Sequence, residues 1–355
     1  MKNKTGQKEL YKEYPLPDEA KEIEQMLELM TYFHLQQAKL LGRFRRGQHT
    51  KDTGCLKGEF RVESGLPEWV RVGVFQEPQT FDAIIRFSNG SFKIQSDRQG
   101  DGRGMAIKLL GVGGKQVLPP EDLANGSDSE QDFIMVNNPV FPFPDIRAYR
   151  HFFELRKWFG GQVGKFLFFL PRPRLRQIAQ SALNAQVSNP LEIQYWSMSP
   201  YRLGNRAMKF SAKPTNQDRH PSPSPVNPGQ DDFLFDALAE RIKEGDVYFD
   251  FMVQCQTDPD KMPIEDVSIE WPEPASNVEV DLSQPNSKFI KVATVKIPQQ
   301  DPYSDSLKKF REACENKIFS PWHAILAHQP LGGINRLRKV AYHESALRRR
   351  RQNTP

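Results

Sequence analysis

Two groups of short apolar runs constrain the fold of this chain more than any other feature. The first group lies between residues 58 and 141, and the second spans 191–214 and 246–296. Both are rich in Val, Ile and Phe, and turn residues separate the runs, a pattern typical of antiparallel strands. Neither group is self-sufficient, because its strands need partners. We therefore expect the two groups to close into one antiparallel β-barrel, which leaves no exposed strand edges. The clearest runs of the first group are 58–62, 70–74, 83–87 and 105–109.

Helical patterns flank and interrupt the predicted strands. Apolar residues recur at helical spacing over 18–41, with Asp18 at the N-cap position. Residues 146–186 show a second helical pattern, which Gly160 and Pro171 break. The chain is therefore predicted to be an α+β protein with helices around the barrel.

The domain organisation predicted from the sequence is simple. Residues 1–17 are polar and end in prolines, which indicates a flexible N-terminal arm. The stretches 111–131 and 214–230 are rich in Gly, Pro, Ser or Asn and predict loops. Because the strands on either side of these loops need one another, we expect a single domain over 18–355.

Composition excludes two classes of protein. The 355 residues are 38% hydrophobic and 11% aromatic, which is too apolar for a disordered chain. The longest apolar run, 166–170, is far short of a membrane-spanning helix. The first residues are charged rather than apolar, so we expect no signal peptide.

The three cysteines, Cys55, Cys255 and Cys314, are widely spaced and fit no metal-ligand pattern. Their odd number argues against a disulfide framework and fits a reducing compartment. We therefore expect a cytoplasmic protein.

The formal net charge is +5, and much of the excess lies in the run from Arg348 to Arg351. Such a run is most often solvated, although it can contact nucleic acid or anionic lipid. The sequence has no zinc-finger spacing and no helix-turn-helix pattern. We expect no specific nucleic-acid binding and only a weak contact with an anionic membrane surface.

The C-terminal region carries a pattern with chemical consequences. If residues 335–349 form a helix, Arg338 and Tyr342 are one turn apart on the same face, and Arg349 follows two turns later. A fixed cation beside a phenol favours the phenolate. A phenolate is a hard anionic ligand for ferric iron, including haem iron. The alternative is an ordinary amphipathic helix with a buried tyrosine.

Three further places carry candidate site residues, each weak alone. His49 lies between the first helix and the first strand, where an imidazole could act as a general base; a surface histidine is the alternative. Arg86 and Ser88 share one face of a strand. A buried arginine there needs an anion, either a haem propionate or an ordinary carboxylate. Asn137, in an Asn-Asn-Pro turn, ends another strand.

Taken in order, these motifs resemble those of the haem catalase superfamily, and the resemblance extends from about residue 30 to 350. The order is specific, whereas each motif alone is weak. The motifs are Arg46-x-x-His49-x-Lys51, Gly58-x-Phe60-x-Val62, Arg86-Phe87-Ser88, Arg103-Gly104-x-Ala106-x-Lys108, Asp132 to Phe141 with Asp145, Trp196 to Pro200, Asp266 to Pro272, Phe319-Ser320-Pro321 and Arg338-x-x-x-Tyr342.

The resemblance implies haem b buried between the barrel and the helices, with Tyr342 as the iron ligand and Arg338 stabilising its phenolate. His49 would be the distal acid and base, Ser88 would hold its ring, and Asn137 would orient the peroxide. The remaining cofactor contacts implied are propionate binding by Arg46, Arg86 and Arg349, and ring stacking by an aromatic of the Tyr149, Phe152 and Phe153 group.

The sequence departs from the family pattern at two site positions. Anchored on Pro139, the distal asparagine position falls on Val136; anchored on the asparagine pair it falls on Asn137, which we prefer. Gln48 precedes His49, where hydrogen-peroxide catalases have a small aliphatic residue. A hydrogen-bonding side chain there would alter the basicity or orientation of His49.

The chain ends soon after the tyrosine helix, so we expect no C-terminal flavodoxin-like domain. In this and in Gln48 it resembles the catalase-related allene oxide synthases and mini-catalase peroxidases. The resemblance implies an enzyme acting on organic or fatty-acid hydroperoxides by rearrangement or reduction. Association with a lipoxygenase and with further copies of the chain are open questions. The alternatives are dismutation of hydrogen peroxide and haem binding without turnover. His323, His328 and His343 are interpreted as structural or surface residues.

Overall fold

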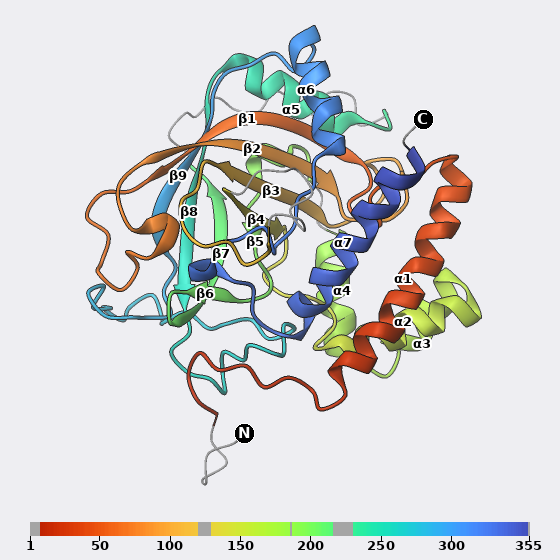
Figure 1. The fold of residues 1–355 in the computed structure, drawn as a ribbon, viewed down its shortest axis with the longest axis horizontal. Coiled ribbons are helices and arrows are strands. Elements are labelled where there is room, and N and C mark those ends of the chain that lie inside the picture. The colour runs from red at the N-terminus through yellow and green to blue at the C-terminus, as the bar shows by residue number, and fades with distance from the viewer. Residues whose placement is uncertain (1–7, 120–128, 185–186, 216–229, 354–355) are drawn as a thin grey trace.

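We describe the protein from a computed structural model, over residues 8–119, 129–184, 187–215 and 230–353. Eight antiparallel strands close a ring in the order β5-β4-β3-β2-β1-β9-β8-β7 and back to β5, and β6 extends the edge at β7. The ring confirms the predicted closed barrel (Figure 1). The strands are β1 (Asp52–Val62), β2 (Thr80–Asn89), β3 (Arg103–Leu110), β4 (Glu130–Val136), β5 (Tyr195–Trp196), β6 (Tyr201–Leu203), β7 (Arg206–Pro214), β8 (Val247–Cys255) and β9 (Ile290–Ile297).

Helices cover the barrel on two sides. Figure 1 shows α7 beside α1 on one side, with α2 and α3 next to α1, whereas α5 and α6 lie near β1. The helix predicted over 18–41 is confirmed. The helical pattern predicted over 146–186 is confirmed as far as residue 184, with breaks at Gly160 and near Pro171 as expected, and residues 185–186 lie outside the described residues. The helices are α1 (Glu19–Leu41), α2 (Ile146–Phe159), α3 (Gly161–Phe169), α4 (Pro173–Asn184), α5 (Phe233–Glu244), α6 (Asp305–Asn316) and α7 (Gly333–Asn353).

Some local predictions were wrong or incomplete. Residues 70–74, expected as a strand, form a turn that leads into a 3-10 helix, η1 (Gly73–Phe75). Asp18 precedes α1 but its carboxylate pairs with Arg147 instead of capping the helix. The sequence interpretation also missed α5 and α6. Parts of the predicted loops, 120–128 and 216–229, lie outside the described residues.

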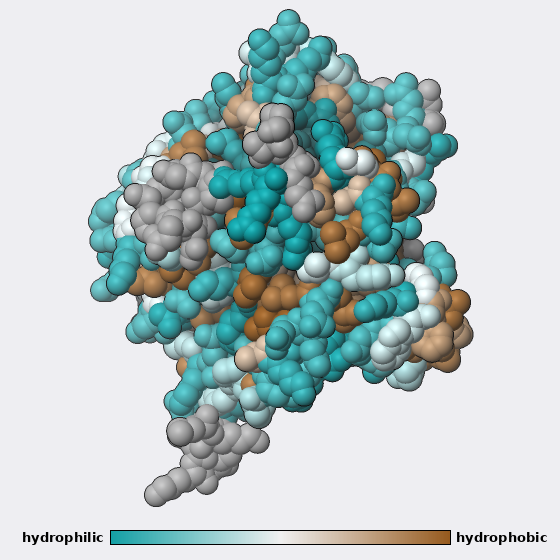
Figure 2. Space-filling view, turned by 45° about the vertical axis from the view of Figure 1, so that its right-hand side comes forward, coloured by the Kyte–Doolittle hydropathy of each residue, from teal (hydrophilic) through white to brown (hydrophobic). Residues whose placement is uncertain are grey.

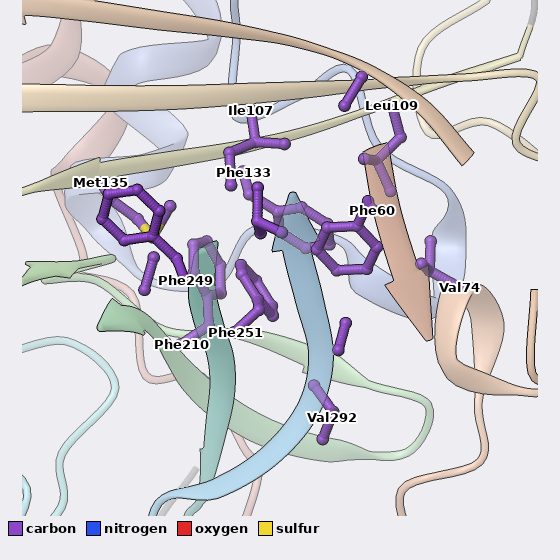
Figure 3. Close-up of a cluster of buried hydrophobic side chains, with 14 of the residues drawn as sticks. Phe60, Val74, Ile107, Leu109, Phe133, Met135, Phe210, Phe249, Phe251 and Val292 are labelled. Atoms are coloured by element: carbon purple, nitrogen blue, oxygen red, sulfur yellow. The ribbon is translucent and has the colours of Figure 1, made fainter. Parts of the chain in front are cut away.

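The barrel interior is a packed aromatic core (Figure 3). The Phe133 ring on β4 lies 5.8 Å from that of Phe60 and 4.7 Å from that of Phe251, measured between centroids. Phe75 and Phe210 extend the cluster, and all five side chains are fully buried. Small barrels are commonly filled in this way. The interior therefore leaves no room for a large cofactor, and a functional site has to lie outside the barrel.

Strand alternation directs polar side chains to the outer face of the same wall. Phe87 belongs to the interior cluster, whereas Arg86 and Ser88 point outward, as the alternation predicted. In the ladder Arg86 is opposite Ala106 of β3, and Ser88 is opposite Gly104. This register places small side chains beside the polar ones on the face that looks towards α7.

The cysteines depart from expectation. A disulfide joins Cys55 on β1 to Cys314 at the end of α6, and Cys255 is free and buried. The argument from an odd number was wrong because one pair forms and the third cysteine stays alone. The reducing compartment inferred from it loses that support, and the cytoplasmic location stays a prediction.

The described part of the predicted arm lies against the body of the protein. The backbone nitrogen of Tyr11 donates to the Gln256 side chain over 2.6 Å, and that of Tyr14 donates to Glu265 over 2.9 Å. Residues 1–7 lie outside the described residues. Among the described helices, none has the length and apolar character needed to cross a membrane.

Candidate active site

Two adjoining cavities separate the outer face of the barrel wall from α7. Their volumes are about 100 and 240 Å³, and His49 and Tyr342 line both. The cavities therefore bring together, from opposite ends of the sequence, the two residues singled out as distal base and iron ligand.

His49 occupies a strained and tightly held position. Its φ of 52° is left-handed, which is uncommon for a residue other than glycine and is often found at functional sites. Its ring nitrogen Nδ1 lies 3.0 Å from Ser88 Oγ, and Arg86 donates to its backbone oxygen over 3.0 Å. Burial, together with the cations of Arg86 and Arg338, lowers the pKa of His49 to about 3. The imidazole is therefore neutral near pH 7, so one ring nitrogen can accept a proton.

Gly104 makes the position of His49 possible, and sequence reasoning did not assign it a role. A Cβ at Gly104 would lie 2.6 Å from His49 Nδ1 and 2.8 Å from Ser88 Oγ. Both distances are shorter than a Cβ can tolerate, so the histidine ring fits against β3 only because residue 104 has no side chain. A glycine inside a strand is itself a signal of such a close approach.

Arg338 and Tyr342 are in contact on α7, as their helical spacing predicted. Arg338 Nη2 donates to the Tyr342 hydroxyl over 3.2 Å, and the guanidinium carbon lies 5.3 Å from the ring centroid. Asn335 Oδ1 accepts from Arg338 over 3.1 Å and fixes the guanidinium. Burial opposes the charge, but Tyr342 and Tyr201 raise the pKa of Arg338 above its usual value. A permanent cation therefore stands beside the phenol.

Three arginines gather around Glu315 at one end of the smaller cavity, two at its carboxylate and one at its backbone oxygen. Arg46 Nη1 lies 2.7 Å from Glu315 Oε1, Arg86 Nη2 lies 3.2 Å from the same oxygen, and Arg349 donates to the Glu315 backbone oxygen over 2.9 Å. All three arginines line the cavity. Sequence reasoning missed Glu315, because α6, which carries it, had not been predicted.

Electrostatics shows that positive charge is in excess here. Burial and the neighbouring cation of Arg86 lower the pKa of Arg46 to about 9, and burial lowers the pKa of Arg349 to about 10. Arg349 Nε is buried without a hydrogen-bond partner among the described residues. One carboxylate therefore does not satisfy the cluster, which has capacity for a further anionic ligand.

Gln48 contacts one of the predicted ring-stacking residues. Its Nε2 donates to the Tyr149 hydroxyl over 2.6 Å, and both residues line the larger cavity. Burial raises the pKa of Tyr149 to about 12, so this phenol stays protonated. Phe152 instead packs on Phe143 and Phe168, with ring centroids 4.8 and 5.4 Å away, and is absent from the described walls of both cavities. The geometry favours Tyr149 over Phe152 as a cofactor contact.

The asparagine pair, Asn137 and Asn138, directly follows the last residue of β4. Asn137 Oδ1 accepts from the Arg103 backbone nitrogen over 2.7 Å, which fixes the side chain in the wall of the larger cavity. Asn138 donates to the Ile178 backbone oxygen over 3.4 Å. Val136 lines the same cavity but has no polar atom in its side chain, so the structure is compatible with the preference for Asn137.

A second polar cluster is buried beneath Phe319. Glu130, Asp132 and His323 lie close enough together to hold a metal ion. The ammonium of Lys108 lies among them, 2.8 Å from Asp132 Oδ1 and 3.2 Å from His323 Nδ1. Lys108 forms ion pairs with both carboxylates, so we interpret the cluster as structural. His328, whose Nε2 accepts from the Val74 nitrogen over 3.0 Å, is also structural.

Comparisons with known proteins place the fold. No protein-family model matches the sequence, and no curated protein is detectably similar to it. The structure is similar to those of a fungal catalase, of catalase A from Saccharomyces cerevisiae and of a bacterial catalase, with TM-scores of 0.62, 0.62 and 0.64. Sequence identities are 16%, 17% and 14%.

The alignments cover 86%, 86% and 89% of this chain, but only 59%, 61% and 60% of those three catalases. The chain therefore spans about three fifths of their length. At these identities the likeness concerns architecture alone, and it agrees with the closed barrel and the helices around it. The described residues of this chain have the catalase fold.

Proposed function

We propose that this chain is a haem-dependent enzyme that metabolises hydroperoxides, with a tyrosinate-ligated haem b and organic hydroperoxides as preferred substrates. The observation that carries the proposal is that a candidate base and a candidate iron ligand face each other across the two cavities. His49, with Ser88 behind it, faces the cavities from the barrel side, and Tyr342, with Arg338 beside it, faces them from α7. A distal base opposite an anionic iron ligand is the arrangement that peroxide chemistry needs.

The residues present fit a haem. Tyr342 would ligate the iron, and Tyr149 would contact the macrocycle from the cavity wall. The cluster of Arg46, Arg86 and Arg349 would bind the propionates by charge-assisted hydrogen bonds, and the unpartnered Nε of Arg349 supports this role. When bound, the ferric iron would supply the redox chemistry that cleaves the peroxide O–O bond.

The protein groups supply proton transfer and orientation. Neutral His49 can accept the proton of a hydroperoxide at a ring nitrogen and later return it, while Ser88 and Gly104 hold the ring in place. Arg338 supplies the positive charge that a phenolate at Tyr342 requires. Asn137, fixed by its bond to the backbone of Arg103, would orient the substrate.

An organic substrate is supported by the size and lining of the larger cavity. Its volume of about 240 Å³ is well above the roughly 10–15 Å³ that one water molecule needs, and its wall is largely apolar, including Met30, Val140, Phe141, Ile334 and Leu337. Apolar walls with few polar groups are typical of sites for apolar ligands. The contact between Gln48 and Tyr149 adds a polar feature beside His49.

Dismutation of hydrogen peroxide is the second candidate, and the likeness to proteins described as catalases favours it. Both candidates use the same base and ligand, so the spectrum of a haem complex does not separate them. The substrate preference does.

The test uses haem-loaded protein with linoleate hydroperoxide and, separately, with hydrogen peroxide. We expect rapid consumption of the lipid hydroperoxide, with product analysis by mass spectrometry separating rearrangement from reduction to the alcohol. Rapid oxygen evolution from hydrogen peroxide with untouched lipid hydroperoxide would contradict the substrate preference. Failure to form a five-coordinate ferric tyrosinate spectrum would contradict the whole proposal, and a stable haem complex without turnover of either peroxide would indicate a haem carrier.

The variant Gln48→Val tests the residue beside the base. It restores the small aliphatic side chain of hydrogen-peroxide catalases and removes the bond to Tyr149. We expect the ratio of hydrogen peroxide to lipid hydroperoxide turnover to rise. An unchanged ratio would show that Gln48 does not influence selectivity.

A further inference from the structure

The hairpin of α2 and α3 exposes a continuous apolar face. Val163, Phe166, Leu167 and Leu170 recur at the spacing of one helical face and are 52%, 61%, 37% and 55% exposed. The opposite face of α3 is the buried one, with Phe168 packed on Phe143 over 5.5 Å. The short helix therefore has apolar residues on both sides, and one side has no partner among the described residues.

The turn between the two helices enlarges this face. Trp158 and Phe159, the last residues of α2, are 66% and 53% exposed. Figure 2 shows apolar surface at the right-hand edge of the molecule, at the level of α2 and α3 in Figure 1. Single exposed apolar residues are ordinary, but a contiguous group marks an interaction site. We name the group the hairpin patch: Trp158, Phe159, Val163, Phe166, Leu167 and Leu170.

Along the chain, the segment that contains the hairpin patch and continues through α4 carries charge of one sign. From residue 155 to 191 the sequence contains six basic residues and no acidic residue, although the net charge of the whole chain is only +5. Lys157, Arg174 and Arg176 are exposed, and Lys165 and Arg172 are partly exposed. A tryptophan and phenylalanines surrounded by Lys and Arg are the composition of segments that lie in the interface of an anionic bilayer.

We propose that the hairpin patch docks the protein on the surface of a bilayer that contains anionic lipids. The nine residues of α3 are too few to span the hydrocarbon layer, so the helix would lie in the interface. A second copy of the chain fits less well, because a two-fold contact would place the patch on itself and bring like charges together. The basic run at the C-terminus, from which the sequence suggested membrane contact, belongs to α7 and is not needed.

Docking by this hairpin would deliver substrate beside the cavity, a consequence that rests on the proposed function. α2 contributes Tyr149 to the wall of the larger cavity, and α4 contributes Ala182. α2 thus carries both part of the hairpin patch and part of the cavity lining. A fatty-acid hydroperoxide leaving the bilayer would meet the protein at these elements.

The experiment is co-sedimentation of the purified protein with vesicles, without substrate, so that its failure is independent of turnover. We use vesicles of phosphatidylcholine alone and of phosphatidylcholine with phosphatidylglycerol in equal parts. Binding is expected only to the mixed vesicles and should weaken at high salt, because ions screen the attraction. With brominated lipids, fluorescence quenching should occur and should be largely lost in Trp158→Phe, since the other tryptophans are less exposed.

The double variant Trp158→Ser with Phe166→Ser should weaken partitioning roughly 100-fold, because two large aromatic side chains no longer leave water. Its matched control is Leu40→Ser with Val278→Ser, which removes apolar side chains that are 79% and 53% exposed elsewhere. Three results would overturn the proposal: no binding to mixed vesicles, binding that both double variants retain equally, or self-association without vesicles that the first variant abolishes.

Discussion

The inner and outer faces of one barrel wall differ in what they contribute, although β2, β3 and β4 build both. The inner face is aromatic and aliphatic, with Phe87, Ile107 and Phe133 fully buried. On the outer face Arg86 and Ser88 meet the cavities opposite α7. Alternation therefore lets each strand stabilise the fold with one set of residues and position chemistry with the other. Substitutions at the two faces should separate stability from activity.

The largest effect on haem binding and turnover is expected from a substitution on α7, which lies opposite the barrel wall across the cavities. Tyr342→Phe removes the proposed iron ligand while keeping the ring, so pigment and turnover should both be lost, with little change in the unfolding temperature of the haem-free protein. Absorption spectroscopy after haem addition is the measurement. Tyr303→Phe is the matched control, because this phenol lines neither cavity and donates to Asp236 over 2.7 Å. Pigment and rate retained in Tyr342→Phe would refute the proposed ligand.

The inner face should behave in the opposite way. Phe133→Ala empties the centre of the aromatic cluster, and such truncations cost about 3–5 kcal/mol of unfolding free energy. Urea denaturation measures the loss, and the protein that remains folded should keep its haem spectrum. Phe166→Ala, at a 61% exposed position, is the control and should change stability little. Equal stability of the two variants would mean that the barrel core is not packed as described.

The disulfide connects β1 of the barrel wall to Cys314, the residue before Glu315 of the arginine cluster. Cys55 and Cys314 are 259 residues apart in sequence, and a bond that closes so long a loop typically stabilises a protein by about 2–4 kcal/mol. Cys314→Ser should lose that amount and should become insensitive to reducing agent, as judged by urea unfolding. Cys255→Ser is the control and should keep the response to reductant. A wild-type protein that unfolds identically with and without reductant would argue against the bond.

On the outer face, Gly104→Ala should lower the rate about 100-fold, the order expected when a catalytic group is displaced by an ångström. The added methyl group would lie 2.6 Å from His49 Nδ1, so the ring must move. The effect should fall on turnover more than on haem binding, because Tyr342 and the arginines are untouched. Gly113→Ala, where a Cβ meets nothing within 4 Å, is the matched control. Unchanged kinetics would show that the position of His49 does not limit the reaction.

The two faces also differ in how far the sequence could predict them. Period-two alternation fixed the sides of Arg86 and Phe87 correctly, because it depends only on local geometry. Helical spacing likewise predicted the contact of Arg338 with Tyr342. Glu315 escaped prediction, because its partners lie more than 200 residues away in sequence and its helix lies outside the predicted elements. The Cys55–Cys314 bond was missed for the same reason, since residue types alone do not reveal which distant segments meet.

The smallest predicted effect is the pH dependence of stability that arises from two histidines, His49 on the outer side of the barrel and His328 on the inner side. Burial and nearby arginines lower the pKa of His49 to about 3, whereas burial lowers that of His328, packed on Phe75 inside the barrel, to about 4. The unfolded chain binds these protons below pH 6.5 and the folded protein does not. The free energy of unfolding should therefore be fully retained above that pH and should fall as the pH drops towards 4. At pH 5 each histidine should lower the free energy of unfolding by about 2 kcal/mol relative to pH 7.

Bound haem should change the contribution of His49 to this pH dependence and leave that of His328 unchanged. His49 is destabilised as a cation partly by Arg86, Arg338 and Arg46, so an anion bound to this cluster would raise its pKa, whereas His328 has no such cation among the causes of its shift. Urea unfolding of wild type, His49→Gln and His328→Gln at pH 7 and pH 5 measures each contribution, with the exposed His151→Gln as control. The difference between wild type and His49→Gln should shrink when haem is bound, and that between wild type and His328→Gln should not. If haem left the His49 contribution unchanged, the arginine cluster would not be where its propionates bind.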